Sequence, residues 1–372
     1  MHVLEFTLSI LTVAGAWRPL SCTSLVKNVI YNAYTILLST AVFMFTTTQF
    51  MYLIFNANNA DEVTETLYVA LLGLIGNFKI ITINLNHQSF AAMLDNLSEK
   101  PFKPMEQNET IIRAKFDKMI KTNAIVYLTL IVLTDIYMTS TSLLMDFRRR
   151  DLTFKAWFPF DYSVSVIYYF LYIHQMISVT LCGFLNVASD CFFSGLLLHI
   201  CCQIEILEYR LSRIANNQAK LRECVLHHYR IFEFADMLND KLVIVIGSQF
   251  IGACLVVCCL LLRLTISTSS FMYIETVMCT GCALIAIFYY CWFGNEVRLK
   301  SIQLSENIYK MEWPDFNNDV KKCFLIIMNR ATSLPIKFTS AHIVPLNLES
   351  FVVVLKTSYS VFNLMRPTQE EK

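Results

Sequence analysis

Seven apolar runs dominate the pattern of hydrophobic and polar positions along the chain. They cover approximately residues 29–55, 63–85, 122–145, 162–189, 242–264, 271–294 and 344–366. A helix needs about 20 predominantly apolar residues to cross the hydrocarbon core of a bilayer. The runs also lack the period-two alternation of a membrane β-barrel. The pattern therefore predicts an all-α integral membrane fold with seven transmembrane helices, arranged as one domain over residues 1–372.

The composition agrees with this fold class. Hydrophobic residues make up 55% of the chain and charged residues 16%, and the mean hydropathy is +0.50. These values are too apolar for a soluble chain of 372 residues. The sequence shows no metal, phosphate or nucleophile motif and no apparent inverted repeat, so we expect neither an enzyme nor a transporter, and no cofactor or metal.

The basic residues predict the orientation, because Lys and Arg gather on the cytoplasmic side of membrane proteins. The loop at 56–62 has no basic residue, whereas the segments 86–121, 190–241 and 295–340 hold most of the 30 Lys and Arg residues. The cluster at 148–150 is the main exception, and acidic residues flank it. We therefore expect a cytoplasmic N-terminus and an extracellular C-terminus.

Helical patterns also occur outside the membrane runs. Runs four and five continue as apolar patterns over 191–211 and 221–238, with a polar turn at 216–218 between them, and an amphipathic helix is expected over 319–330. We expect 190–241 and 295–340 to form a cytoplasmic anchor with helical extensions, whose apolar faces an oligomeric collar would cover. Residues 3–16 predict a short interfacial helix rather than a cleaved signal, because Glu5 interrupts the run.

The 13 cysteines and the adjacent histidines do not indicate disulfide or metal chemistry. No cysteine falls in the expected outer loops 56–62, 146–161 and 265–270, so no disulfide framework is expected. Cys279 and Cys282 form a CxxC within a membrane run, which we interpret as small packing residues. His227 and His228 would point about 100° apart on a helix, which makes them poor co-ligands.

Charged residues within the runs are costly in lipid and mark candidate functional positions. We expect Lys79 to extend its ammonium group to the inner interface, and Asp135 to face a polar cavity or a partner helix. Arg263 and Glu275 flank a short outer loop and are expected to pair. Lys356 lies in the middle of the last run, so that helix is expected to border an aqueous path. A helix-packing seam formed by hydroxyl groups is the alternative.

Several motifs in the last third of the chain, and one near its start, are distinctive. They are YKMEWPDF at 309–316, KKCFLIIMNR at 321–330, PIKFTS from residue 335, LNLESFVVVLKTSYSVFNLMR at 346–366, and WRP at 17–19. In these motifs the chain resembles the tuning-subunit branch of the insect odorant receptor family, and the SYSxF sequence at 358–362 is the most specific mark. The related gustatory branch usually has a T-Y-x5-Q-F motif in the last helix, which this chain lacks.

The resemblance implies the odorant-binding subunit of a ligand-gated, non-selective cation channel. Such a subunit would assemble with the co-receptor Orco as a heterotetramer in the dendritic membrane of olfactory sensory neurons. The resemblance also implies that the last helix lines the pore. At this helix it places a hydrophobic gate at Leu364, and further pore residues are expected at Lys356, Ser360, Asn363 and Thr368.

The same resemblance implies a pocket for a small volatile organic molecule among runs two to six, in the outer half of the membrane. Apolar residues with a few hydroxyl groups at that depth would suit such a ligand. The candidate residues are Leu72, Ile75, Tyr137, Met138, Thr141, Tyr169, Phe170, Ile173, Cys254, Val257, Thr276 and Thr280.

The alternative is a seven-helix G-protein-coupled or gustatory-type chemoreceptor. A G-protein-coupled receptor would have its N-terminus outside, but no D-R-Y follows the third run and no N-P-x-x-Y lies in the last. The sequons at Asn96 and Asn108 lie in a loop that we expect in the cytosol. Glycosylation at either asparagine would favour the alternative.

Overall fold

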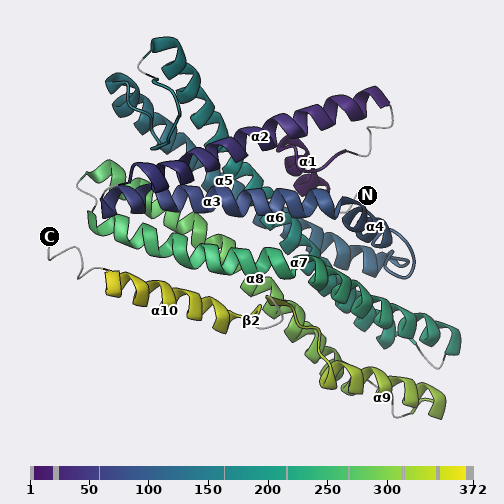
Figure 1. Ribbon diagram of the computed structural model, residues 1–372. Coiled ribbons are helices and arrows are strands. Elements are labelled where there is room, and N and C mark those ends of the chain that lie inside the picture. Colours follow the sequence, from purple (N-terminus) through teal and green to yellow (C-terminus); the bar gives the residue numbers. More distant parts are fainter. Residues whose placement is uncertain are drawn as a thin grey trace.

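The computed structural model describes residues 4–19, 25–57, 59–162, 164–214, 217–266, 269–311, 313, 315–340 and 344–365. Within these ranges the chain forms ten helices and a two-stranded sheet (Figure 1). The elements are α1 (Glu5–Val13), α2 (Leu25–Phe55), α3 (Ala60–Leu85), α4 (His87–Asn96), α5 (Gln107–Arg149), α6 (Ser165–Ser212), α7 (Gln218–Ile266), α8 (Ser270–Tyr309), α9 (Asn318–Ser333), β1 (Thr339–Ser340), β2 (Val344–Pro345) and α10 (Leu348–Met365).

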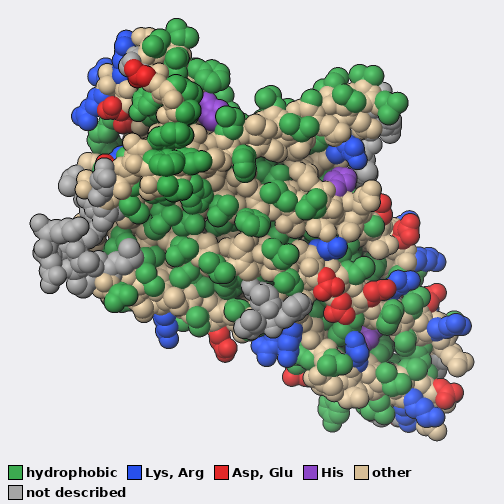
Figure 2. Space-filling view, viewed as in Figure 1, with side chains coloured by type: hydrophobic (Ala, Val, Ile, Leu, Met, Phe, Trp, Pro, Cys, Tyr) green, Lys and Arg blue, Asp and Glu red, His purple; other side chains and the backbone are tan. Residues whose placement is uncertain are grey.

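The predicted all-α membrane fold is confirmed. Within the described residues six helices, α2, α3 and α5 to α8, are long and apolar enough to cross a bilayer. Glu349 and Lys356 lower the hydropathy of α10, which falls outside this group but packs along α7 and α8 as the seventh helix of the bundle. Figure 2 shows a largely apolar surface between two ends where charged side chains gather, one over α7 and α9 and the other over the connection from α5 to α6.

Four membrane helices are much longer than the bilayer requires. The predicted extensions of runs four and five are confirmed, because α6 has 48 residues and α7 has 49. The predicted helices near the N-terminus and at 319–330 also form, as α1 and α9. The sequence analysis did not predict that α5 already begins at Gln107 or that α8 continues to Tyr309. Helix α4 was not predicted either.

The main core surrounds the second half of α6. Every residue from 187 to 204 is buried, and α6 packs against α1, α2, α3, α5, α7 and α8. A helix that is apolar on all sides belongs in the interior of a bundle. The chain therefore covers this stretch with its own helices, whereas the sequence analysis left that role to an oligomeric collar. Leu4, just before α1, contributes by packing against Gly195, where an added Cβ would lie 2.6 Å from Leu4 Cδ2.

A two-stranded antiparallel sheet lies between α9 and α10 in the chain and fixes the start of the last helix. Thr339 of β1 pairs with Pro345 of β2 in antiparallel register, and the backbone N–H of Leu346 donates to the carbonyl oxygen of Phe338 at 2.9 Å. Helix α8 approaches this linker at Gly294, where an added Cβ would lie 2.5 Å from Leu346 Cβ and 3.0 Å from its carbonyl oxygen. Glycine at this position therefore permits the close contact between α8 and the beginning of α10.

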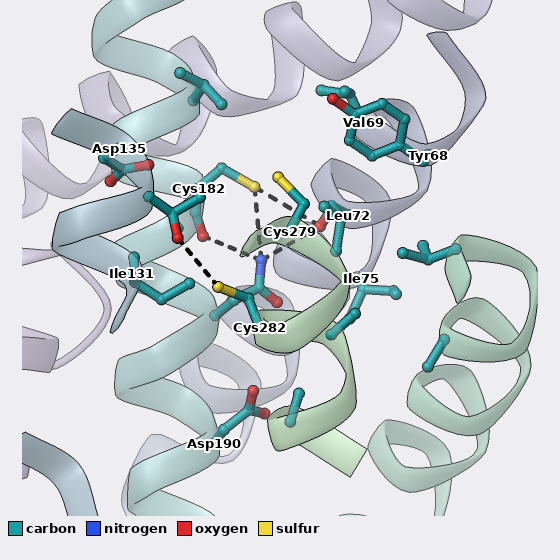
Figure 3. A pocket seen from close by; sticks show the side chains of 18 of the residues that line it. Tyr68, Val69, Leu72, Ile75, Ile131, Asp135, Cys182, Asp190, Cys279 and Cys282 are labelled. Atoms are coloured by element: carbon teal, nitrogen blue, oxygen red, sulfur yellow. Dashed lines mark hydrogen bonds between the residues drawn. The ribbon is translucent and has the colours of Figure 1, made fainter. Parts of the chain in front are cut away.

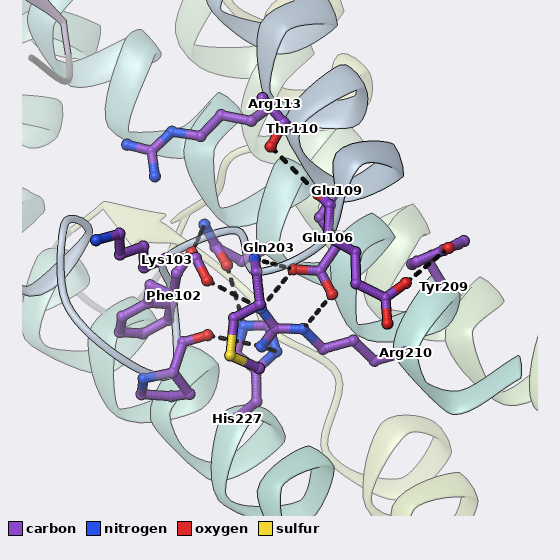
Figure 4. A network of polar contacts seen from close by, with 12 residues as sticks. Phe102, Lys103, Glu106, Glu109, Thr110, Arg113, Gln203, Tyr209, Arg210 and His227 are labelled. Carbon is purple, nitrogen blue, oxygen red and sulfur yellow. Dashed lines mark hydrogen bonds and ion pairs between the residues drawn. The ribbon is translucent and has the colours of Figure 1, made fainter. Parts of the chain in front are cut away.

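A buried polar network joins the start of α5 to the end of α6 and the start of α7 (Figure 4). Arg210 donates to both carboxylate oxygens of Glu109, at 2.9 Å from Nε and 2.8 Å from Nη2, and the two side chains are only 9% and 2% exposed. Arg210 also donates to the carbonyl oxygens of Pro101, at 2.7 Å, and Lys103, at 3.1 Å. One guanidinium therefore holds the 101–106 connection against two helices.

Burial and hydrogen bonding decide the protonation states in this network. Burial raises the pKa of Glu109, but hydrogen bonds from Arg210 and from the Met105 N–H outweigh it, so this pKa lies below its ordinary value. Burial and the neighbouring Arg210 charge hold the pKa of His227 well below its ordinary value. The neutral ring accepts at Nδ1 from Arg210, at 3.2 Å, and donates from Nε2 to Gln203 Oε1, at 3.0 Å. Both nitrogens of His227 are thereby engaged.

Candidate functional site

Six helices enclose a cavity of about 110 Å³ within the bundle (Figure 3). Along α3 and α5 to α8 the wall residues, some of them adjacent pairs, recur every three or four positions, so each of these helices turns one face to the cavity. Helix α2 contributes Phe45. The principal wall residues from the other helices are Tyr68, Leu72, Ile75 and Lys79 of α3, Tyr127, Ile131, Asp135 and Met138 of α5, Val179, Cys182, Asn186 and Asp190 of α6, Gln249, Ala253 and Val256 of α7, and Cys279, Cys282 and Ala286 of α8.

The wall is mostly carbon and sulfur, which suits a compact apolar ligand. An engineered cavity of roughly 150 Å³ lined by apolar side chains binds benzene, so a volume of about 110 Å³ is on the scale of a single ring or a short chain. No disulfide joins the twelve cysteines in the described ranges. Within those ranges no group of three metal-binding side chains occurs.

An ion pair marks one end of the cavity. Lys79 Nζ lies 2.6 Å from Asp190 Oδ1, with side chains 1% and 0% exposed, and donates to Asn186 Oδ1 at 3.1 Å. Tyr290 OH also donates to Asp190 Oδ1, at 2.8 Å. The expectation that Lys79 extends to the interface is wrong, because a carboxylate on α6 offers its ammonium group a partner inside the bundle.

Other polar groups of the wall bind one another. Asn186 Nδ2 donates to the carbonyl oxygens of Leu72, at 3.3 Å, and Cys182, at 3.0 Å. The Thr134 hydroxyl donates to the Leu130 carbonyl oxygen at 2.9 Å and lies 3.4 Å from Cys282 Sγ. These bonds hold α3 against α6 and α5 against α8 around the cavity.

A second, more polar cavity of about 550 Å³ lies at the end of the bundle where α3 and α8 begin. It shares Tyr68, Val69 and Met138 with the first cavity. Arg263 donates to Glu275 Oε1 at 2.9 Å and to Tyr68 OH at 3.0 Å. The predicted pairing of Arg263 with Glu275 is therefore confirmed, and Tyr68 stands between the two cavities.

The candidate ligand residues divide between these cavities and other surroundings. Leu72, Ile75 and Met138 line the first cavity, and Met138 and Thr141 line the second. Asp135, expected to face a polar cavity or a partner helix, lies on the wall of the first.

The remaining candidates lie elsewhere. Tyr169, Phe170 and Ile173 are 42%, 69% and 56% exposed, so they face out of the bundle. The others make contacts of their own. Tyr137 OH donates to the Phe271 carbonyl oxygen, and the Cys254 carbonyl oxygen accepts from Ser358. Val257 packs in the core beside the cavity, and Thr276 and Thr280 donate to carbonyl oxygens one turn back in α8.

Several wall residues were missed by the sequence analysis, although a signal for them was present. Cys182, Asn186 and Asp190 are spaced four apart on α6, which places three polar groups on one face of a membrane helix. Such a face must be turned away from lipid. The spacing therefore identifies the inward side of α6, together with Gly183 and Val179 on the same side.

Helix α10 has one packed face and one free face. Val354 and Ser358 are buried, and the Ser358 hydroxyl donates to the Cys254 carbonyl oxygen of α7 at 3.2 Å. The predicted pore residues of the described chain are all exposed and recur at spacings of three or four along the other face: Lys356, Ser360, Asn363 and Leu364. Thr368 lies outside the described residues.

Comparisons with known proteins decide which family has this arrangement. A family model described as 7tm Odorant receptor matches residues 59–359. The chain belongs to the insect odorant receptor family. Odorant receptor Or1 of Anopheles gambiae is 24% identical over 358 residues, covering 85% of this chain and 84% of that receptor. Odorant receptor 46a, isoform A, of Drosophila melanogaster is 23% identical over 328 residues, covering 85% of each chain.

A solved structure shares the fold of this odorant receptor. The insect olfactory receptor OR5 from Machilis hrabei, in complex with eugenol, superposes with a TM-score of 0.86 over 98% of this chain and 97% of that one, at 17% identity. The family match confirms the resemblance read from the C-terminal motifs. The protein is accordingly a multi-pass membrane receptor and not an enzyme.

Proposed function

We propose that this odorant receptor is the ligand-binding subunit of a ligand-gated, non-selective cation channel. It works with the co-receptor Orco as a hetero-oligomer, a tetramer, in the dendritic membrane of olfactory sensory neurons. Its N-terminus lies in the cytosol and its C-terminus outside, in agreement with the Lys and Arg bias of the loops. Family membership supports the receptor role, and the eugenol complex of the Machilis receptor supports a small organic ligand.

The exposed polar face of α10 is the observation that carries the channel proposal. Lys356 is exposed near the middle of this helix, with Ser360 and Asn363 on the same side. An exposed cation at membrane depth is costly unless it faces water or a partner helix. Copies of this face arranged around a common axis would enclose an aqueous path, which a single chain cannot form.

Leu364 supplies the barrier on that path. Its side chain is 78% exposed near the end of α10, on the face that carries Lys356. A ring of such apolar side chains blocks ions by excluding water until the helices move apart. A ligand in the cavity opens this barrier only if it binds the open state more tightly than the closed state.

Co-expression with Orco in a non-neuronal cell tests the function. We expect an odorant panel to evoke non-selective cation currents in cells that contain both proteins, and none in cells that contain this chain alone, because one chain supplies only part of the pore wall. Whole-cell recording measures the currents, with Orco alone as the control. A second-messenger response without current would contradict the channel proposal.

Leu364→Ala tests the gate. Removing this side chain takes away roughly 1.5–3 kcal/mol of apolar contact in the closed ring, so we expect the current without ligand to rise about 10- to 100-fold. Leu37→Ala is the matched control, because Leu37 of α2 is 67% exposed and lies away from α10. Unchanged basal current and unchanged activation in Leu364→Ala would remove Leu364 from the gate.

A further inference from the structure

Three oxygen atoms on the wall of the first cavity are buried and have no hydrogen-bond partner within the described part of the chain. They are Oδ2 of Asp135, Oδ2 of Asp190 and Oε1 of Gln249. They come from three different helices, α5, α6 and α7, and Figure 3 shows the first two carboxylates at different places on the wall. An amide oxygen accepts hydrogen bonds and does not donate them, and a carboxyl group has an accepting oxygen in either protonation state. The cavity thus offers three acceptors without a matching donor.

The strongest donors near these atoms are already engaged. Lys79 is bound to Asp190 and Asn186, and Asn186 donates to two backbone carbonyls. The Thr134 hydroxyl donates within its own helix. A buried acceptor left without a donor costs about 1–3 kcal/mol. A hydrogen-bond donor on a ligand would therefore contribute more binding free energy here than in an ordinary apolar cavity.

Asp135 is the acceptor best placed for a ligand. Lys79, the lysine of this wall, pairs with Asp190, and Arg263 pairs with Glu275 in the second cavity, so Asp135 has no cation beside it among the described residues. Helix α6 carries Gly183 opposite its carboxylate, and an added Cβ there would lie 3.5 Å from Oδ2 and 3.7 Å from Oδ1. The glycine leaves the carboxylate open toward the cavity.

We propose that the cavity selects compact, mostly apolar ligands that carry an N–H or O–H donor, and that Asp135 accepts that donor. This inference rests on the proposed function of the cavity as the odorant site. The apolar wall holds the body of the ligand, and Gln249 or Asp190 receives a further hydrogen where the ligand has one, as a protonated amine does. A ligand with acceptors alone leaves the oxygens of Asp190 and Gln249 without a donor.

Ligand pairs of equal size test the selection in cells that contain the wild-type receptor and Orco. Cyclohexanol is compared with cyclohexanone, and benzyl alcohol with benzaldehyde, while cyclohexylamine distinguishes an ammonium donor from a hydroxyl donor. We expect each alcohol to reach half-maximal current at a concentration about 5- to 100-fold lower than its carbonyl partner, the range for giving a donor to a buried acceptor that lacks one. Equal potencies within both pairs would overturn the inference.

Asp135→Asn tests whether Asp135 is responsible for the preference for ligands that carry a donor. Asparagine keeps the shape and adds an N–H₂ donor, so we expect the alcohols to lose about tenfold in potency while the carbonyl compounds keep or gain potency. Asp151→Asn is the matched control, because Asp151 is exposed outside both cavities. An unchanged preference for donors in Asp135→Asn would mean that ordered water, and not the ligand, pairs with this carboxylate.

Gly183→Ala gives a second test if Asp135→Asn does not reach the cell surface. The added methyl group covers the carboxylate without changing any charge, so it too should reduce the donor preference, and surface labelling confirms its expression. The two proposals fail differently. Current evoked by a broad odorant panel but by none of the five probes overturns the donor inference alone, whereas no current with any odorant overturns the proposed function.

Discussion

Arg210→Met is expected to lower the free energy of unfolding by about 3–5 kcal/mol, the cost of removing one partner from a buried ion pair. The variant would leave the Glu109 carboxylate buried without its cation. It would also take the donor from the carbonyl oxygens of Pro101 and Lys103. Because the network joins α5, α6 and the start of α7 (Figure 4), we expect the loss to loosen the end of the bundle where these three helices meet.

Thermal unfolding of the purified receptor, together with surface expression, measures this effect. The matched control is Lys115→Met, because Lys115 also pairs with a glutamate, Glu205, at 3.0 Å but is 65% exposed. An exposed pair contributes only about 0–1 kcal/mol. The double variant Glu109→Met/Arg210→Met should regain most of the stability, since it leaves no unpaired charge. If Arg210→Met were as stable as Lys115→Met, the network would not hold this end together.

The membrane helices could be predicted from the sequence, whereas α4 and the early start of α5 were missed. In lipid, the backbone must form helices and their side chains must be apolar, so the length of each run is a direct signal. Outside lipid a helix depends on packing against its neighbours. Helix α4 buries Phe90, Met93 and Leu94, a weaker pattern in ten residues of mixed polarity. Its partners lie on distant parts of the chain.

The sequence predicted at what depth in the membrane the candidate site residues lie, but only partly which of them face the cavity. Leu72, Ile75 and Met138 line the cavity. Phe170 of α6 was predicted as a ligand residue on the same grounds, but its side chain faces out of the bundle. In a membrane helix both the lipid face and the core face are apolar, so hydropathy does not separate them. Polar residues do, because Asn186 and its neighbours one turn away must point inward.

The partner of Lys79 could not be predicted from local sequence for a different reason. Lys79 and Asp190 are separated by 111 positions in the chain, and they meet only because α3 packs against α6. Near the end of a membrane run, a lysine usually reaches the interface along its flexible stem. Its burial here follows from the carboxylate and the amide that α6 presents to it.

Lys79→Met is expected to cost about 3–5 kcal/mol of stability, because Asp190 would remain buried with Tyr290 as its hydrogen-bond donor and no cation. The pair forms one end of the cavity, so the variant that still reaches the surface should also respond more weakly to odorants. Surface labelling, thermal unfolding and recorded current separate the two effects.

Two further variants decide whether the lost charge balance is the cause of the Lys79→Met effect. Lys79→Met/Asp190→Asn removes both charges and keeps the donor contact from Tyr290, so it should recover much of the stability that Lys79→Met loses. Lys155→Met breaks a pair with Glu62 at 3.1 Å in which Lys155 is 36% exposed, and it should cost no more than about 1 kcal/mol. If Lys79→Met and Lys79→Met/Asp190→Asn lost equal stability, the charge of Lys79 would not be what stabilises the bundle. The packing of its aliphatic stem between α3 and α6 would then be the cause.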